Sequence, residues 1–321
     1  MKKLLIALAA LFAAAPAAGA RQAPPADPDE TLVEEFVVQG RLPGPAWWRV
    51  SDADTTVYVL GVPSAFPKGL DWNKVVLERR LEGASQIILP FNEIRIGLAD
   101  IPGSLLGLPG IRTRDMEAEL SPPIRARFVA ARTALGKEKK TYEKWKPFIA
   151  ALMLVGHFRD SEKITAADPG KTIRRMAQAR GVKVVMKTYS AGPLVRSVAR
   201  ISPAAGQACM ADALTEVEAG SARVRVAGEG WAAGDVRTAL SQERGFERCL
   251  AAVPGAEAFN SRFKGDQAAA IARALKTPGH AVAVVQLRPL LAQDGVLARL
   301  RAQGFKVLDP GQPDPDARPA A

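Results

Sequence analysis

A serine that follows an apolar, β-branched run is the first residue of this chain that could carry out chemistry. Residues 55–61 are typical of a buried strand that ends at Gly61, and Gly61-Val62-Pro63-Ser64 leads out of it. A serine hydroxyl becomes a nucleophile only when a general base lies within hydrogen-bond reach. Apart from histidine, the sequence offers Lys187 or Glu93 as that base. A nucleophilic Ser64 therefore requires the fold to bring one of them close.

Metal chemistry has few candidate ligands in this sequence. The chain has two histidines, His157 and His280, and neither stands in a spacing typical of metal ligands. We expect each to be a surface or capping residue, and we expect no metal and no cofactor. The sequence also lacks His-Glu-x-x-His, Gly-x-Ser-x-Gly and Cys-x-x-Cys, and Gly170-Lys171-Thr172 is interpreted as the first turn of a helix rather than as a phosphate loop.

Two strand-helix-strand units, one toward each end of the chain, would position these residues. The first has a strand over 55–61, a helix that Asp71 caps and that reaches Ala84, and a strand over 86–89 that ends at Pro90. The second has a strand over 281–285, a helix over 290–303 that Gly304 ends, and a strand over 305–308. We expect both units to contribute to one sheet.

The region between the two units reads as mainly helical. Its predicted elements are one or two helices over 124–158, a helix begun by Asp168-Pro169 and ended by Gly181, a strand over 182–186, and helices over 207–217, 233–244 and 256–276. Trp231 is expected to be a packing anchor before one of these helices. The predicted fold is α/β: a mixed β-sheet from two strand-helix-strand units with a mainly helical middle region.

Both units resemble the TraB/GumN family, which includes relatives of the TIKI metalloproteases. Family members carry Gly-x-x-His after the first strand and Glu after the second, where this chain has Ser64 and Pro90. The closing unit carries a second Gly-x-x-His in the family, and its histidine position falls on Pro289 without a gap or on Arg288 with one inserted residue. A mid-chain Leu-Glu-Thr is matched by Met186-Lys187-Thr188, so lysine replaces the acid.

The resemblance implies a fold in which the two units face each other across a cleft, and it implies a degenerate site. The vestigial positions are Gly61, Ser64, Pro90, Lys187 and Arg288. A neutral hydroxyl is a poor ligand for a transition metal, and proline has no side-chain donor. The leading hypothesis is a pseudoenzyme that binds a molecule of the cell envelope without catalysis. The alternative is a peptidase-like hydrolase with a site rebuilt from Ser64, Glu93, Lys187 or Arg288.

The N-terminus has the features of a secretory signal peptide. Lys2 and Lys3 precede an apolar run, and Ala18-Gly19-Ala20 is a small-x-small signal for cleavage between Ala20 and Arg21. We predict a signal peptide over 1–20, a disordered linker over 21–42, one domain over 43–309 and a disordered tail over 310–321. The mature protein would be periplasmic or secreted, without a transmembrane span.

The cysteine count supports the same compartment. Cys209 and Cys249 are the two cysteines of the chain. An even count in an exported protein predicts that they form a disulfide, with a pair of buried free thiols as the competing idea.

Basic charge is concentrated in the middle third of the chain. The net charge is +11, and removal of Lys2 and Lys3 leaves 42 basic and 33 acidic residues, or +9. Residues 111–200 contain 20 basic and 8 acidic residues. Such a field favours an anionic envelope glycan or lipid headgroup as partner. A solvated basic helix face is the alternative, and nucleic acid is not expected because no binding motif accompanies the charge.

Overall fold

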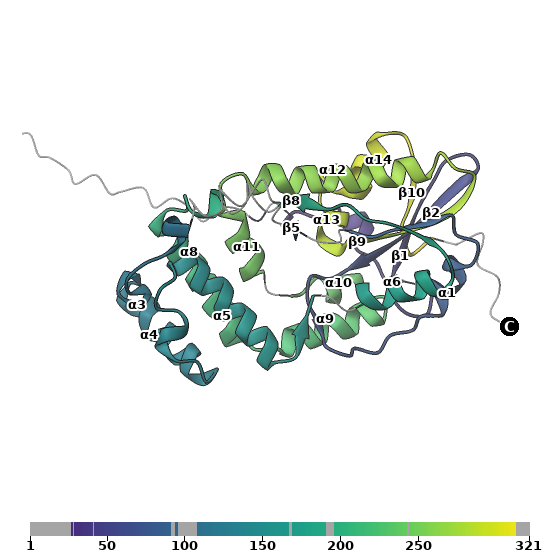
Figure 1. Ribbon diagram of the computed structural model, residues 1–321. Coiled ribbons are helices and arrows are strands. Elements are labelled where there is room, and N and C mark those ends of the chain that lie inside the picture. The colour runs from purple at the N-terminus through teal and green to yellow at the C-terminus, as the bar shows by residue number, and fades with distance from the viewer. Residues whose placement is uncertain are drawn as a thin grey trace, which may run out of the picture.

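A six-stranded mixed sheet forms the centre of the protein (Figure 1). The computed structural model describes residues 27, 29–40, 42–90, 94–95, 108–166, 169–190, 196–242 and 244–312. The strands follow one another across the sheet in the order β10 (Lys306–Leu308), β1 (Trp47–Ser51), β2 (Thr55–Val62), β9 (Gly279–Gln286), β4 (Gln86–Ile88) and β7 (Lys183–Val185). Both predicted strand-helix-strand units contribute to this sheet, so the predicted α/β class is confirmed.

The parallel pairing of β2 with β9 joins the two ends of the chain at the centre of the sheet. The register runs from Thr55 opposite Gly279 to Val62 opposite Gln286. Their central residues, from Val57 to Leu60 and from Ala281 to Val285, are almost entirely buried. A near-continuous apolar run is what a strand covered on both faces requires.

Helices cover both faces of the sheet. On one side lie α1 (Val75–Leu81) and α6 (Gly170–Ala179), and on the other lie α12 (Ala256–Ala274) and α14 (Val296–Ala302) (Figure 1). Their apolar side chains and those of the strands form one buried cluster. Trp231 belongs to it, because it is 3% exposed and its ring packs edge-on against Phe66 and Trp72.

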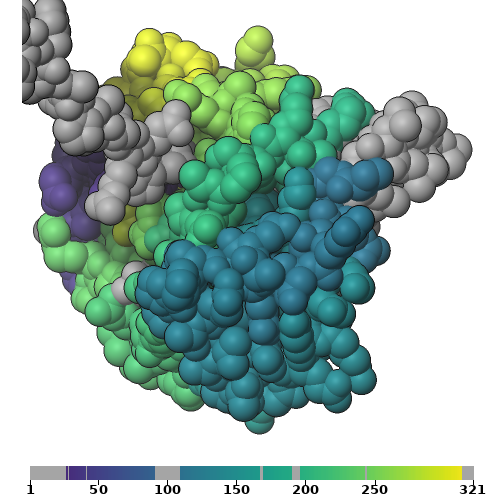
Figure 2. Space-filling view, turned by 90° about the vertical axis from the view of Figure 1, so that its left-hand side faces the viewer, coloured from purple at the N-terminus to yellow at the C-terminus, as the bar shows by residue number. Residues whose placement is uncertain are grey.

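A second buried cluster lies within a separate helical layer. Its main helices are α3 (Met116–Glu119), α4 (Pro122–Ala134), α5 (Pro147–Ser161), α8 (Pro203–Ala219) and α11 (Gly245–Ala251). Seen from the side, residues 110–165 make up much of one continuous face of the molecule, in blue to teal (Figure 2). Among the described residues, no helix combines the length and apolar character that crossing a bilayer requires.

Shorter elements connect these layers. They are η1 (Glu34–Phe36), β3 (Phe66–Pro67), β5 (Ile94–Arg95), η3 (Leu108–Ile111), η4 (Lys139–Thr141), β6 (Ile164–Thr165), β8 (Tyr189–Ser190), α9 (Ala222–Ala232), α10 (Val236–Ala239) and α13 (Leu287–Leu291).

Three predicted helices differ from the structure. The helix expected over 290–303 is divided into α13 and α14. The turn between them requires glycine at position 295, because a Cβ atom there would lie 2.6 Å from the carbonyl oxygens of Pro289 and Ala292. The helix expected over 233–244 is the single turn α10. Asp71 does not cap α1, which begins after Lys74; it forms an exposed ion pair with Lys74 instead. Asp168, expected to begin α6, lies outside the described residues.

The segment before β1 packs on the domain where it is described, which differs from the disordered linker expected over 21–42. Phe36 is 1% exposed and belongs to the buried cluster around the sheet. The backbone N–H of Val33 donates to Leu291 O at 3.0 Å. Residues 1–26, with the predicted cleavage point between Ala20 and Arg21, and residues 313–321 lie outside the described residues.

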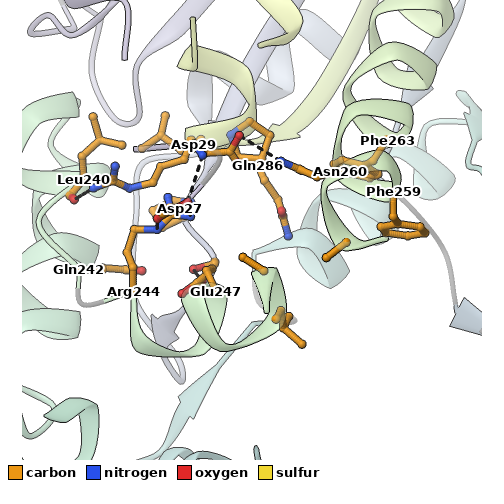
Figure 3. A pocket seen from close by; sticks show the side chains of 18 of the residues that line it. Asp27, Asp29, Leu240, Gln242, Arg244, Glu247, Phe259, Asn260, Phe263 and Gln286 are labelled. Carbon is orange, nitrogen blue, oxygen red and sulfur yellow. Dashed lines mark hydrogen bonds and ion pairs between the residues drawn. The ribbon is translucent and has the colours of Figure 1, made fainter. Parts of the chain in front are cut away.

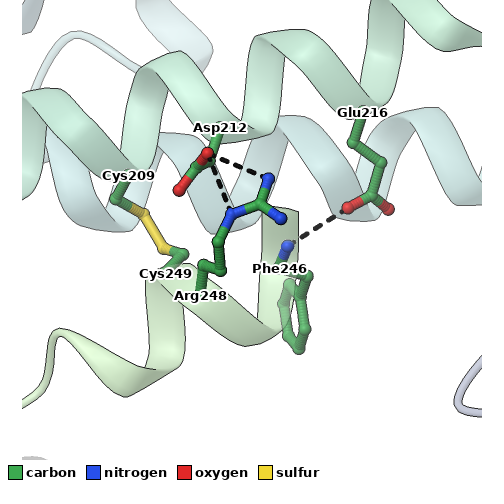
Figure 4. The surroundings of a disulfide bond; sticks show 6 residues. All are labelled: Cys209, Asp212, Glu216, Phe246, Arg248 and Cys249. Atoms are coloured by element: carbon green, nitrogen blue, oxygen red, sulfur yellow. Dashed lines mark hydrogen bonds and ion pairs between the residues drawn. A yellow bond between two sulfur atoms is a disulfide. The ribbon is translucent and has the colours of Figure 1, made fainter. Parts of the chain in front are cut away.

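The structure joins Cys209 and Cys249 in a disulfide between α8 and α11, with their Cα atoms 4.6 Å apart (Figure 4). Two further contacts hold the same helices together. Arg248 donates to Asp212 Oδ1 from Nε at 3.2 Å and from Nη2 at 3.1 Å, and the Phe246 N–H donates to Glu216 Oε2 at 3.2 Å. The position of α11 is therefore fixed covalently and by hydrogen bonds.

We predict that loss of the disulfide lowers the free energy of unfolding by about 3 to 4 kcal/mol, because the bond closes a loop with a sequence separation of 40. Denaturant titration of Cys209→Ser/Cys249→Ser against the oxidised wild-type protein measures the difference. A thiol assay on the denatured, unreduced protein is the control, and two reactive thiols would contradict the pairing.

We predict that Gly61→Ala lowers the free energy of unfolding by about 1 to 3 kcal/mol, because the added methyl overpacks the core. A Cβ atom there would lie 2.5 Å from Leu287 Cδ1 and 3.0 Å from Trp48 Cζ3. Gly156→Ala is the matched control, since nothing lies within 4 Å of its Cβ position within α5. Equal unfolding midpoints for the two variants would show that the core accommodates the methyl.

Candidate functional site

A cavity of about 290 Å³ opens where β2 and β9 end. Because parallel strands end at the same edge of a sheet, the loop after β2 and the helix after β9 both reach it, and this is the edge at which α/β folds bind ligands. Ser64 and Arg288 line the cavity. The cleft expected between the two terminal units is therefore present, and it contains two of the predicted site residues.

The remaining wall comes from helices α10, α11 and α12 and from the N-terminal segment. Leu240, Gln242, Arg244 and Asp27 lie on one side of the cavity, and Phe259, Asn260 and Phe263 of α12 lie on the other (Figure 3). Glu247 points toward it from the first turn of α11. The cavity thus has a charged side and a largely apolar side.

Ser64 is hydrogen-bonded to a carboxylate. Its Oγ donates to Glu247 Oε1 at 2.7 Å. The other carboxylate oxygen, Oε2, is buried and has no hydrogen-bond partner among the described residues. The disulfide and the Arg248 contacts hold α11, so they also hold Glu247 beside Ser64. Among the described residues, the potential base beside Ser64 is therefore Glu247 and not Lys187, which pairs with Asp266.

Arg288, the residue after Leu287 at the start of α13, brings a positive charge to the same cavity. Its Nη2 donates to Leu240 O at 2.7 Å. Burial lowers the pKa of Arg288, the nearby Arg244 lowers it further, and the carboxylates of Asp27 and Glu247 act in the opposite direction. Within the described part of the chain, no carboxylate forms an ion pair with this guanidinium.

Two buried ion pairs bring the N-terminal segment to the charged side of the cavity. Arg244 Nη2 donates to Asp27 Oδ1 at 2.8 Å and its Nε lies 2.6 Å from Oδ2, with the two side chains 12% and 5% exposed. Lys264, 1% exposed, contacts Asp29 at 3.0 Å and Asp294 at 2.6 Å. Buried charges are costly unless they are paired, so these contacts fix the segment in place.

The other vestigial positions do not line the cavity. Gly61 packs beneath it, and its carbonyl oxygen accepts a hydrogen bond from Trp231 Nε1 at 2.7 Å. The Pro90 carbonyl accepts from Gln267 Nε2. Lys187 forms an ion pair with Asp266 at 2.7 Å.

Asp266 belongs to a small network beside the cavity. Burial raises its pKa, but hydrogen bonds from Lys187 and Tyr189 outweigh burial, so the pKa of Asp266 is lowered overall. Burial and the neighbouring carboxylate raise the pKa of Tyr189. Lys187 is therefore occupied as an ion-pair partner rather than available as a base. Glu93 lies outside the described residues.

Both histidines have structural partners away from the cavity. His157 Nδ1 lies 2.7 Å from the Tyr142 hydroxyl within the helical layer, and burial, followed by the charge of Lys137, lowers its pKa. His280 Nε2 donates to Arg80 O at 3.1 Å, near the start of β9 and so at the opposite end of that strand from the cavity.

The residues at the vestigial positions do not fit a divalent metal ion. The Ser64 hydroxyl, which donates a hydrogen bond to Glu247, is neutral and a poor ligand for such an ion, and Arg288 is a cation without a lone pair to offer. In the described ranges, no three His, Cys, Asp or Glu side chains are grouped so that they could hold a metal ion. We therefore derive no metal-dependent step.

The sequence did not identify Glu247, Arg244 or Asp27 as site residues. Each forms its contact across a large sequence separation, 183 residues for Ser64 and Glu247 and 217 for Asp27 and Arg244. In the sequence they are charged residues next to apolar segments. This pattern is common on protein surfaces and does not mark a functional site.

We predict that Asp27→Ala lowers the free energy of unfolding by about 3 to 5 kcal/mol, because it leaves the buried Arg244 unpaired. Glu34→Ala is the matched control, since it removes an ion pair with Arg237 from the same segment. Those side chains are 73% and 71% exposed, and the expected loss is below about 1 kcal/mol. Similar losses in denaturant titrations of the two variants would mean that the Asp27 pair is solvated.

Comparison with known families matches residues 46–308 to the TraB/PrgY/gumN family model. Comparisons with curated proteins and with solved structures gave no match. The family match covers the sheet, the helical layer and both strand ends that form the cavity. The chain therefore belongs to the TraB/PrgY/gumN family.

Proposed function

We propose that this protein is exported and binds a ligand in the cavity between its two terminal units without metal-dependent hydrolysis. One observation carries the proposal: Ser64, and both Pro289 and Arg288, the two positions between which the resemblance leaves the second histidine, line the cavity, and neither histidine of the chain does. A hydroxyl and a guanidinium can orient a ligand by hydrogen bonds, whereas metal-dependent hydrolysis needs ligands with available lone pairs.

Two features support export and a periplasmic or secreted location. The first is the basic, apolar and small-residue pattern of residues 1–20. The second is the Cys209–Cys249 pair, since disulfides persist in oxidising compartments.

The basic helical layer gives weaker support to an anionic glycan or lipid headgroup as the partner. Many of its cations already contact carboxylates: Arg127 pairs with Glu218, Arg132 with Glu117 and Lys139 with Asp115. Such pairing reduces the field available to an external anion. The cavity is therefore the better candidate for ligand binding.

The rival function is hydrolysis by a rebuilt site, and the hydrogen bond from Ser64 to Glu247 favours it. A carboxylate 2.7 Å from a serine hydroxyl can act as its general base. Arg288 would then stabilise a developing negative charge on the substrate. This function would need no metal.

We predict that the purified mature protein, incubated with zinc or manganese and then desalted, retains far less than one equivalent of metal and shows no metal-dependent peptidase activity. Elemental analysis and peptide-library digestion measure both. Stoichiometric metal with peptidase activity would overturn the proposed function. Metal-independent hydrolysis that Ser64→Ala abolishes and Ser85→Ala, remote from the cavity, leaves intact would establish the rival.

A further inference from the structure

We propose that the cavity binds a free apolar α-amino acid, with the ammonium group on Glu247, the carboxylate on Arg288 and the side chain against the aromatic wall of α12. The inference rests on the proposed function, since it names the ligand of the same cavity. It is carried by the size of the cavity, by two oppositely charged side chains that each have one hydrogen bond but no ion pair among the described residues, and by the apolar surface beside them.

The volume restricts the ligand to one small molecule. About 290 Å³ lies at the lower end of the range for ligand pockets, roughly 300 to 1,000 Å³. A single amino acid fits such a space. An oligosaccharide segment or a lipid with its headgroup does not.

The unpartnered groups on the charged side require both a donor and an acceptor from the ligand. Glu247 Oε2 is buried without a hydrogen bond among the described residues, so it requires a donor. Arg288 gives one hydrogen bond to a backbone carbonyl, and its remaining N–H groups match the planar geometry of a carboxylate. An α-amino acid carries an ammonium group and a carboxylate on the same carbon atom.

The charge balance favours a zwitterion over an anion. Of the charged residues that line the cavity, Asp27 is neutralised by Arg244, and Asp29 by Lys264 behind the wall. Glu247 and Arg288 remain, one negative and one positive. A simple anion would satisfy Arg288 and be repelled by Glu247, whereas a zwitterion satisfies both.

The opposite wall selects an apolar side chain. Tyr189 lies with its ring centroid 5.4 Å from that of Phe259 and 6.0 Å from that of Phe263, and Leu250 and Ala251 continue the surface. Phe259 is 37% exposed, an unusual state for a phenylalanine, and this places apolar surface where a side chain would enter. Aromatic rings pack favourably edge-on against one another, so phenylalanine is the natural first probe.

Calorimetric titration of the full mature protein with a dissected ligand series tests the proposal. L-phenylalanine and L-leucine should bind. 3-Phenylpropanoate, which lacks the ammonium group, and 2-phenylethylamine, which lacks the carboxylate, should each bind at least about tenfold more weakly, because each leaves one charged group unpaired. L-Aspartate should not bind measurably.

Two variants assign the contacts. Glu247→Gln should weaken binding of phenylalanine at least about tenfold and should not weaken binding of 3-phenylpropanoate, because the variant removes a carboxylate that repels this anion. Arg288→Met should weaken binding of phenylalanine and should not weaken binding of 2-phenylethylamine, because the variant removes a cation that repels this ammonium compound. Glu218→Gln and Arg127→Met remove the same charges from an exposed pair in the helical layer and should change neither affinity.

Three results would overturn the proposal. Equal affinities of the wild-type protein for all three phenyl compounds would exclude recognition of the zwitterion, and this needs no variant. Tighter binding of phenylalanyl-phenylalanine than of phenylalanine would identify a peptide as the occupant and leave the proposed function intact. Absence of binding by every probe would exclude amino acids, whereas metal-dependent turnover would refute the proposed function itself.

Discussion

The parallel pairing of β2 with β9 is the constraint on which the rest of the structure depends. It joins strands from opposite ends of the domain in eight register pairs, and ordering such a distant contact costs loop-closure entropy that local structure cannot repay. Burial of apolar surface offsets this entropy cost, because the side chains of Val57, Val59, Val282 and Val284 are 0% exposed. Since both strands run in the same direction, their ends meet at one edge. The loop that carries Ser64 and the turn that carries Arg288 are brought together for that reason, and not by any direct contact between them.

Buried charge determines how this edge is closed. Lys264 is 1% exposed within α12 and would be strongly destabilising alone, but Asp29 and Asp294 surround its ammonium group. These ion pairs connect the N-terminal segment, α12 and the turn before α14. A second ion pair, between Asp27 and Arg244, connects the N-terminal segment to the residue before α11. Asp27 and Asp29 of the segment before β1 are thereby held in the cavity wall.

The sequence predicted the elements whose cause is local and missed those whose cause is tertiary. The β-branched runs that form β2 and β9 predict buried strands, because their apolar residues are nearly continuous. The break between α13 and α14 was not predicted, although Asp294-Gly295 is a dipeptide typical of turns. What the sequence does not show is that Gly295 approaches two carbonyl oxygens in the folded chain. The family resemblance located Ser64 after the first strand, and Pro289 or Arg288 after the strand of the closing unit. Glu247 and Asp27 could not be located in this way, because ion pairs and hydrogen bonds across more than 180 residues leave no periodic pattern.

The arginine that follows β9 gives the cavity a positive charge but no metal ligand. A guanidinium stays charged and presents a fixed fork of donors, so Arg288 keeps a positive charge in the cavity despite the burial that lowers its pKa. It can therefore orient a carboxylate as a cation would. Unlike a metal ion, the guanidinium cannot bind a water molecule and lower its pKa to form a hydroxide, which is the step that metal-dependent hydrolysis requires. Arg288 can therefore hold an anionic ligand group by charge, whereas neither its guanidinium nor the neutral Ser64 hydroxyl is a good ligand for a divalent metal ion.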